Sequence, residues 1–196
     1  MYGLWGMLFS MLKENSIYNN KVNKYIWFKM DFLALDFETA NYYRDSACAL
    51  GLVRVENNEI VEKASFLIQP PYKFFVFTYV HGITWEDVED KPTFEQHWKS
   101  IKPFFEQIDF AVAHNASFDS NVLRACCERH KIITPEVDFW CTMKLSRKVF
   151  GLCPTNLPTV CKKFNIDLQH HDALSDTLAC AKIMIEILKK QELKKC

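Results

Sequence analysis

The chain has 196 residues, of which 49% are apolar and 14% aromatic, and it carries 24 basic and 24 acidic side chains. This length and composition predict one folded domain with a substantial core, and they exclude an intrinsically disordered chain. The formal net charge of zero neither points to a nucleic-acid partner nor excludes one, because carboxylates that bind divalent ions are neutralised by them.

Residues 1–29 differ in character from the rest of the chain. An uncharged apolar run over residues 1–12 is too short to span a bilayer and lacks the basic leader of a signal peptide, so no membrane span is predicted. We expect Met30 to be the natural start, with residues 1–29 a flexible or non-native extension and residues 30–196 a single domain. A peripheral membrane or partner-binding tail is the alternative. The eight cysteines form no CxxC pair, which indicates reduced thiols and a cytoplasmic protein.

Strand-like and helix-like segments alternate in the remainder of the chain. The apolar run at residues 31–39 is typical of a buried strand, and residues 47–55 and 60–69 flank a polar turn at Asn57 and Asn58, which predicts an antiparallel hairpin. Further along we expect a helix over residues 93–107 that Pro103 bends or ends early, a strand at 110–114, a helix over 119–130, a strand at 137–141, helices up to 150 and over 155–164, and a last helix over 172–190. This order predicts an α/β fold in which a mixed sheet, three antiparallel strands followed by parallel strands, is flanked by helices.

Four carboxylates and one histidine, spread over three segments, are the residue types that a two-metal phosphodiesterase requires: Asp36, Glu38, Asp119, His171 and Asp176. Asp36 and Glu38 are two positions apart on the first strand, so both side chains project to one face of the sheet. Asp119 follows a strand and a short turn, where it is suited either to a metal or simply to the positive end of a helix. If the three segments converge in space, the protein cuts nucleic acid from an end.

The last two members of this set constrain each other. On one continuous helix His171 and Asp176 would lie about 140° apart. Asp172 is a good N-cap residue, and a helix that starts there leaves His171 on the preceding loop and turns Asp176 toward the sheet. A carboxylate among small apolar neighbours requires a partner, which a metal ion supplies. A solvated Asp176 on the helix edge is the alternative, and His170 is the weaker candidate for the histidine.

Two other features have a structural and a functional interpretation. The connection after residue 70 contains Phe74, Phe75 and Phe77, whose rings have the chemistry to stack on bases. A continuous apolar run is more typical of a core, and we expect these three side chains to be core residues. His114 ends an apolar strand, so we expect a hydrogen-bonded structural histidine there.

In order and spacing, these segments resemble the motifs of the DEDDh 3′–5′ exonucleases, the DnaQ-like family. The motif D-x-E-T appears at residues 36–39, H-N-A-x-F-D at 114–119 and H-x-A-x-x-D at 171–176, and V-H-G-I at 80–83 is similar to the family's segment near the substrate end. The resemblance extends from residue 30 to about residue 190. It implies an RNase H-like fold, with residues 30–196 as the exonuclease domain.

The resemblance also implies the chemistry. It predicts a 3′–5′ exonuclease that releases nucleoside 5′-monophosphates from single-stranded or frayed 3′ ends of DNA, using two Mg²⁺ or Mn²⁺ ions. The implied metal ligands are Asp36, Glu38, Asp119 and Asp176, and the implied general base is His171. Contacts with the terminal nucleotide are expected from Thr39, His81, Ile83 and Asn115, the last chiefly by shaping its turn.

The chain departs from the family at Ala40–Asn41, where many members have Thr–Gly, and this affects the detailed contacts with the 3′ nucleotide. We expect a free-standing enzyme, because no segment after the last predicted helix resembles the polymerase-binding tail of an epsilon subunit. An exoribonuclease that trims RNA ends is one alternative function. A non-catalytic nucleic-acid-binding protein on the same fold is another.

Overall fold

The computed structural model of the chain describes residues 30–193, with side chains for residues 30–190. The predicted extension over residues 1–29 therefore lies outside the described residues. Within them, no helix is long and apolar enough to cross a membrane. The seven cysteines of this part of the chain are free thiols.

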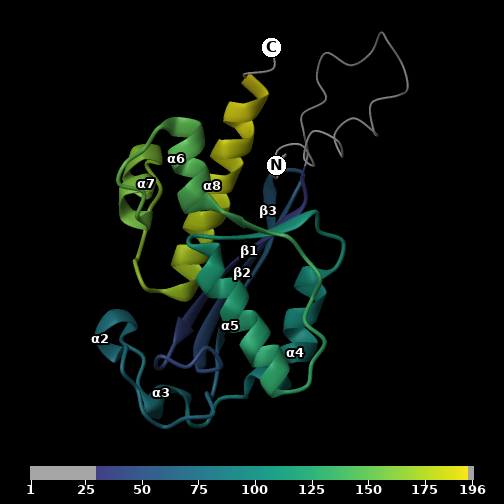
Figure 1. Cartoon of the computed structure of the whole chain (residues 1–196), viewed down its shortest axis with the longest axis vertical. Coiled ribbons are helices and arrows are strands. Elements are labelled where there is room, and N and C mark those ends of the chain that lie inside the picture. Colours follow the sequence, from purple (N-terminus) through teal and green to yellow (C-terminus); the bar gives the residue numbers. More distant parts are fainter. Residues whose placement is uncertain (1–29, 194–196) are drawn as a thin grey trace, which may run out of the picture.

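A five-stranded mixed sheet forms the centre of the domain (Figure 1). Its strands are β1 (Phe32–Thr39), β2 (Ala47–Glu56), β3 (Glu59–Leu67), β4 (Phe110–Ala113) and β5 (Phe139–Cys141). They are ordered β3-β2-β1-β4-β5, with β1, β2 and β3 antiparallel and with β4 and β5 parallel to β1. The hairpin between β2 and β3 turns at Asn57 and Asn58, which both have positive φ. The predicted sheet is confirmed.

The helices follow the predicted order with small changes at their ends. They are α2 (Thr78–His81), α3 (Trp85–Val88), α4 (Phe94–Ile101), the 3₁₀ helix η1 (Lys102–Phe105), α5 (Ala116–Arg129), α6 (Thr142–Phe150), α7 (Leu157–Phe164) and α8 (Ala173–Leu193). The α-helix gives way to η1 at Pro103, as a proline in this position predicts. Helix α5 begins three residues earlier than expected, so Ala116 and Ser117 belong to its first turn. The one-turn helices α2 and α3 were not predicted, since neither is long enough to show a periodic pattern.

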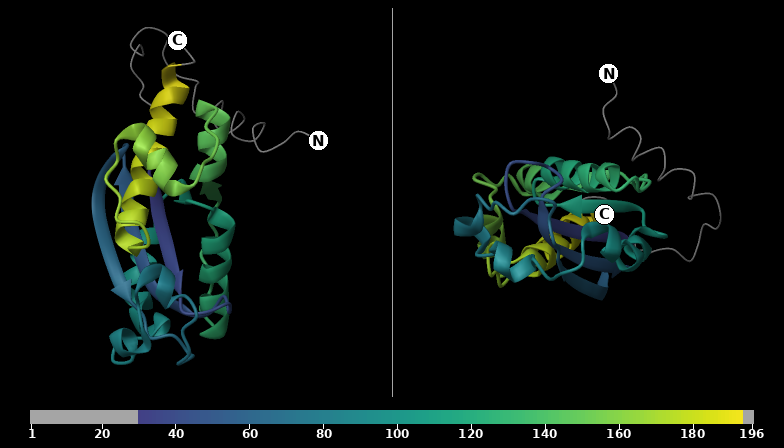
Figure 2. Two further views of the ribbon diagram at one scale, coloured as in Figure 1. Left: turned by 90° about the vertical axis from the view of Figure 1, so that its left-hand side faces the viewer. Right: turned by 90° about the horizontal axis from the view of Figure 1, so that it is seen from below.

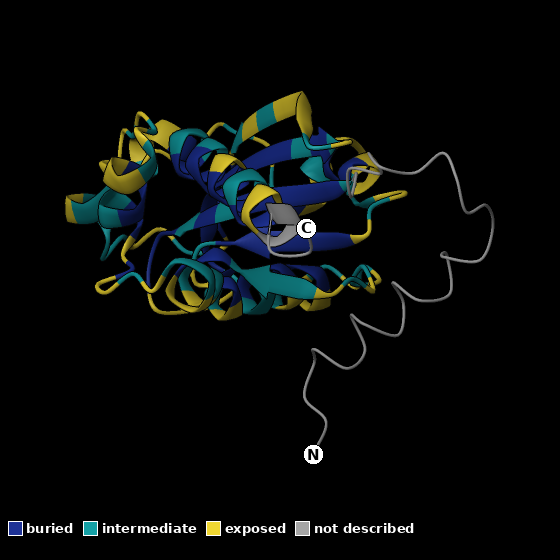
Figure 3. Cartoon of the chain, turned by 90° about the horizontal axis from the view of Figure 1, so that it is seen from above, coloured by how far each residue is buried: buried dark blue, intermediate teal, exposed yellow. Residues whose placement is uncertain are grey.

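The alternation of side chains along β1 builds two separate core layers. Phe32 and Ala34 pack toward α7 and α8, whereas Leu33, Leu35 and Phe37 pack toward α4 and α5. Helices α8 and α5 thus cover opposite faces of the sheet (Figure 2). Buried residues are concentrated on the central strands and on the helix faces that contact them (Figure 3). Because side chains alternate with a period of two, Asp36 and Glu38 share the face of Phe32 and Ala34, which α8 covers.

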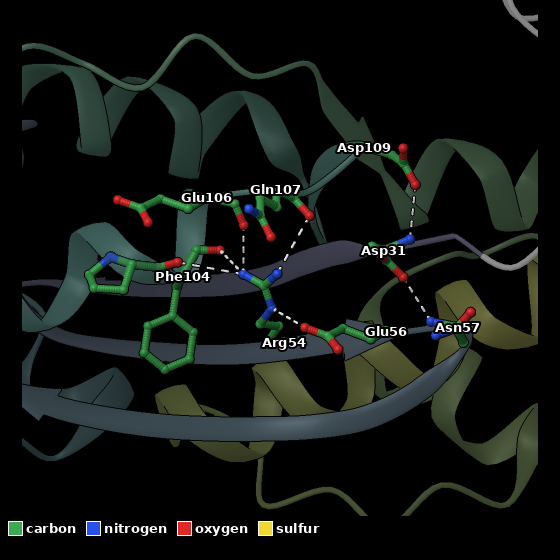
Figure 4. Close-up of polar contacts among 9 residues, drawn as sticks. Asp31, Arg54, Glu56, Asn57, Phe104, Glu106, Gln107 and Asp109 are labelled. Atoms are coloured by element: carbon green, nitrogen blue, oxygen red, sulfur yellow. Dashed lines mark hydrogen bonds and ion pairs between the residues drawn. The ribbon is translucent and has the colours of Figure 1, made fainter.

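A half-buried arginine links β2 to the end of η1, at the end of the sheet opposite the carboxylates. Arg54 of β2 is 13% exposed and pairs with Glu56 at 2.8 Å. Its guanidinium also donates to the backbone carbonyl of Glu106 at 2.8 Å and, at 3.5 Å, to those of Phe104 and Gln107 (Figure 4). The Arg54 side chain therefore satisfies carbonyl groups left unpaired where η1 ends.

The expectation that Phe74, Phe75 and Phe77 are core residues is wrong for Phe74, which is 51% exposed. Phe75 and Phe77 are only half-buried, and none of the three belongs to either core layer. The segment crosses the end of the sheet rather than a face of it, so only part of each ring meets the core.

Candidate active site

Three of the predicted carboxylates converge where β1 ends beneath the first turn of α8. One oxygen each of Asp36, Glu38 and Asp176 lies within 4.8 Å of the other two. The Asp176 side chain is 5% exposed, and its Oδ1 atom is buried without a hydrogen-bond partner. The geometry therefore brings oxygen ligands from two elements to one point and leaves one of them in need of a partner.

Helix α8 approaches the sheet this closely because β2 has a glycine beside Asp36. Gly51 pairs with Asp36 across the two strands. A Cβ atom at Gly51 would lie 2.2 Å from the carbonyl oxygen of Ala173 and 2.4 Å from Oγ1 of Thr177. Any other residue at this position would push the first turn of α8 away from the sheet, and Asp176 with it.

The fourth carboxylate reaches the same strand from the opposite helix. Asp119, in the first turn of α5, is buried and accepts a hydrogen bond of 3.0 Å from the backbone N–H of Phe37. Asp119 does not belong to the group of oxygens within 4.8 Å of one another. It lies close enough to Asp36 for its charge to raise the pKa of Asp36.

The two histidines form a stacked pair on the loop before α8. Asp172 caps the helix by accepting a hydrogen bond of 2.8 Å from the backbone N–H of Ser175, so His171 lies outside the helix, with φ at +69°. The imidazole rings of His170 and His171 stack with their centroids 3.8 Å apart. Asp176 Oδ2 accepts a hydrogen bond of 2.9 Å from Nδ1 of His170 and one of 3.1 Å from the backbone N–H of His171.

Electrostatics at this site favour protonated carboxyl groups in the absence of a cation. Burial is the main cause, and neighbouring carboxylates add to it for two groups: the pKa of Asp36 is raised well above its usual range and that of Glu38 to about 8. Burial alone raises the pKa of Asp119 to about 7, against the effect of the hydrogen bond from the backbone N–H of Phe37. Burial also raises the pKa of Asp176. For His171, burial and the neighbouring His170 ring lower the pKa, so its imidazole is neutral at pH 7.

These residues fit a divalent cation of the hard type. The unpartnered Oδ1 of Asp176 and the mutually repelling carboxylates both require positive charge at the point where they meet. Carboxylate oxygens are the ligands that Mg²⁺ and Mn²⁺ prefer. The site is therefore suited to such ions by its donors and by its charge.

The structure places the other predicted contact residues around the end of β1. Thr39 is buried, and its carbonyl accepts a hydrogen bond of 3.2 Å from Nε2 of His81. Nδ1 of the same ring accepts one of 3.0 Å from the backbone N–H of Ile83, so His81 ties the segment at 80–83 to the strand. Asn115 has a φ of +83° just before α5 and makes no side-chain cap, which agrees with a role in shaping the turn.

His114 is the structural histidine that its position predicts. Its Nε2 donates to the carbonyl of Thr155 at 2.9 Å, and its Nδ1 lies 2.8 Å from the hydroxyl of Thr142. Burial lowers its pKa, so the ring is a neutral bridge between β4 and the segments around α6.

Sequence reasoning missed two features of the site. The role of Gly51 in admitting α8 depends on a contact between segments far apart in the chain, which no local pattern indicates. The hydrogen bond from His170 to Asp176 was also missed, although the doubled histidine before an N-cap residue was a visible sign that two rings would share one loop.

Comparison with known proteins agrees with this geometry. Residues 33–184 match the RNase T exonuclease family. The chain is 32% identical over 170 residues to the DNA polymerase III PolC-type of Bacillus subtilis (strain 168), a match that covers 81% of this chain and 11% of that protein. It is 32% identical over 145 residues to exodeoxyribonuclease 10 of Escherichia coli (strain K12), covering 69% of this chain and 59% of that protein. The chain therefore spans only part of the length of these relatives.

Solved structures share the fold. Exonuclease X in complex with 5′-overhanging duplex DNA superposes with a TM-score of 0.66 at 25% identity, covering 82% of this chain and 93% of that one. The nuclease domain of 3′hExo, a DEDDh family member bound to rAMP, superposes with a TM-score of 0.71 at 18% identity, covering 83% of this chain and 93% of that one. The predicted RNase H-like architecture is confirmed.

Proposed function

Because the chain belongs to the RNase T family of exonucleases, we propose that it is a metal-dependent 3′–5′ exonuclease that releases nucleoside 5′-monophosphates from DNA. The observation that carries the proposal is the convergence of Asp36, Glu38 and Asp176 within 4.8 Å, beside a loop that carries His171. DNA is the substrate that the relatives favour, since one is an exodeoxyribonuclease and another a DNA polymerase.

The carboxylates have the role of metal ligands in this proposal. Asp36, Glu38 and Asp176 would hold one Mg²⁺ or Mn²⁺ ion, and Asp36 with Asp119 would support a second. When bound, the two ions supply the positive charge that stabilises a phosphodiester in the transition state of hydrolysis. The hydrogen bond from Phe37 to Asp119 keeps that carboxylate at the strand end, so the ligand set is largely preorganised.

His171 has the role of general base. Its lowered pKa keeps the ring neutral near pH 7, and a neutral imidazole accepts the proton of an attacking water. Its position on a loop before α8, at the edge of the carboxylate cluster, leaves the ring accessible to a substrate phosphate. Around the end of β1, Thr39, His81, Ile83 and Asn115 would surround the terminal nucleotide.

Release of mononucleotides from labelled oligonucleotides tests the proposal. Single-stranded DNA and RNA of one sequence, labelled at the 3′ or the 5′ end, are incubated with Mg²⁺, Mn²⁺ or EDTA. We expect metal-dependent shortening of DNA from its 3′ end, abolished in Asp36→Asn and retained in Asp167→Asn, an exposed carboxylate outside the cluster. Faster shortening of RNA would reassign the substrate to RNA, and no cleavage of either polymer by folded protein would overturn the proposal.

A further inference from the structure

Exposed aromatic side chains gather at the loop that follows β1, the strand that carries Asp36 and Glu38. Among the described residues, the exposed phenylalanine and tyrosine side chains are Tyr42, Tyr43, Phe74 and Tyr79, with exposed fractions of 78%, 54%, 51% and 83%. All four lie in two segments, the loop 40–46 that follows β1 and the segment 72–81. A cluster of exposed rings confined to one place is typical of a binding surface.

The rings contact one another across the two segments. Tyr43 lies 4.9 Å from Tyr72 and 6.1 Å from Phe74, measured between ring centroids, and Tyr42 lies 4.9 Å from the half-buried Phe77. We refer to Tyr42, Tyr43, Tyr72 and Phe74 as the aromatic ridge. Its two segments meet through the backbone as well, since the N–H groups of residues 76 and 77 donate to the carbonyl of residue 40.

Buried polar groups hold the loop that presents these rings. Asn41 is 1% exposed; its side chain donates to the carbonyl of Phe74 at 3.2 Å and accepts from the backbone N–H of Tyr43 at 2.9 Å. Ser46 is fully buried, and its hydroxyl lies 2.6 Å from the carbonyl of Tyr43. The ridge is therefore preorganised, which lowers the entropy cost of binding to it. Asn41 belongs to the Ala40–Asn41 pair at which the chain departs from the family pattern.

Basic side chains lie along the ridge, and one of them, Arg44, contacts the residue next to Asp119. The guanidinium of Arg44 lies 5.3 Å from the centroid of the Phe118 ring, next to Asp119, and that of Arg129 lies 5.3 Å from the Tyr72 ring. Lys73 is held over the Trp85 ring at the same distance. Acidic groups offset part of this charge: Asp45 pairs with Arg129 at 2.7 Å, and Glu128 and Glu89 lie along the same surface.

The surface beside the ridge has the dimensions of a short single strand of nucleic acid. A surface hollow of about 660 Å³ is lined by Tyr43, Arg44 and Arg129, and a neighbouring one of about 600 Å³ shares Arg129 and contains Lys73 and Trp85. Ten residues of α5 separate Asp119 from Arg129, a length of about 15 Å. This length accommodates about four nucleotides at the 3.4 Å spacing of a stacked strand.

We propose that the aromatic ridge and its basic neighbours bind the single-stranded nucleotides that precede the 3′-terminal one. Aromatic rings that alternate with cations along one path are the combination that recognises single strands without regard to sequence, because every base has a face on which a ring stacks. Continuity with the carboxylate site through Arg44 and Phe118 favours nucleic acid over a protein partner. The inference rests on the proposed function, since it assigns the path of the same substrate.

Dependence on strand length tests the ridge. The substrates are the 4-nitrophenyl ester of thymidine 5′-monophosphate, which has one nucleotide, and oligothymidylates of 2 to 12 residues. We expect kcat/KM of the wild-type protein to rise with length up to about five nucleotides and then to level. In Tyr43→Ala/Phe74→Ala the ratio of kcat/KM for the 12-mer to that for the nitrophenyl ester should fall at least tenfold, since each ring that stacks on a base contributes about that factor.

Two control variants separate stacking from a structural role. Tyr43→Phe keeps the ring and should retain the wild-type ratio, and Ile133→Ala removes a side chain that is 91% exposed away from the ridge and should leave the ratio unchanged. If kcat/KM of the double alanine variant falls equally for both substrates or for neither, the ratio is unchanged and the proposal is overturned; a protein partner would then be the expected ligand of the ridge.

A binding measurement keeps the two proposals distinguishable. Fluorescence anisotropy of a labelled 12-mer in EDTA reports affinity without catalysis. If neither substrate is cleaved but affinity still falls tenfold in the double variant, the proposed exonuclease activity fails while the ridge stands. If cleavage occurs and affinity is the same in both proteins, the ridge assignment fails while the activity stands.

Discussion

Gly51 on β2 lies directly against Ala173 in the first turn of α8, with no room for a side chain between them: a Cβ atom would come within 2.2 Å of the Ala173 carbonyl oxygen. Because Gly51 also pairs with Asp36 across the sheet, this contact sets the distance between the carboxylates of β1 and that of Asp176. The geometry of the candidate active site therefore depends on a residue that carries no functional group.

Gly51→Ala is expected to move Asp176 away from Asp36 and Glu38. The added methyl group must displace the backbone of α8, which we expect to reduce kcat at least a hundredfold and to lower the free energy of unfolding by about 2 kcal/mol, a typical cost of overpacking. Urea unfolding and nuclease assays measure the two effects. Ser65→Ala, at the exposed position that pairs with Gly51 from β3, is the matched control and should change neither; a Gly51→Ala protein with normal activity would contradict this account.

Replacement of His171 distinguishes the two histidines. Asn tolerates the left-handed backbone conformation that His171 adopts at a φ of +69°, so His171→Asn removes the imidazole without adding backbone strain. Loss of a general base predicts a fall in kcat of about 10²- to 10⁴-fold. His170→Asn should cost less, because it removes only one hydrogen bond to Asp176. A larger loss in His170→Asn would move the role of general base to His170.

Stability of the metal-free protein should fall as the pH rises from 6.5 to 8.5. The pKa of Glu38 is raised to about 8 and that of Asp119 to about 7, whereas both lie near 4 in the unfolded chain. The folded state thus binds more protons than the unfolded state between about pH 4 and 8, and the stability that these groups contribute is lost as the pH rises through that range. Histidines with a lowered pKa, such as His171, have the opposite effect, because the unfolded state then binds more protons than the folded state. That difference disappears above about pH 6.5, where the histidines of the unfolded chain also lose their protons.

Melting temperatures in EDTA across this window measure the effect. Glu38→Gln should flatten the pH dependence, and saturating Mg²⁺ should raise the melting temperature most at pH 8.5, because ionised carboxylates then have their partner. A melting temperature that rises with pH in EDTA would show that the pKa values of these carboxyl groups are not raised in the folded protein.

Arg54→Met tests the opposite end of the sheet. Methionine keeps much of the apolar contact of the arginine stem but leaves the carbonyls of Phe104, Glu106 and Gln107 without their donor. We expect the free energy of unfolding to fall by about 2 kcal/mol, within the range for hydrogen bonds that involve a charged group, with kcat unchanged. Arg54→Lys retains one charged donor nitrogen and should recover part of the loss; equal stability of the wild-type protein and both variants would contradict the role given to Arg54.

Local patterns in the sequence were sufficient to predict the strands, the order of the longer helices and the positions of the metal-ligand candidates. Alternation on β1 fixes that Asp36 and Glu38 share a face, and the N-cap at Asp172 determines that His171 precedes its helix. Contacts between distant segments leave no such pattern. The sequence could not show that Gly51 admits α8, and the aromatic run containing Phe74 has the composition of a core strand although it crosses the exposed end of the sheet.

The positions of the carboxylates along the chain also affect when the site can form during synthesis. Asp36 lies on the first strand and Asp176 on the last helix, and the two meet only when α8 docks on β2. During synthesis on the ribosome, a growing chain that has already produced β1 to β5 holds no complete set of ligands. Metal-dependent cleavage should therefore appear only with the folding of α8, and a chain that ends before this helix should show none.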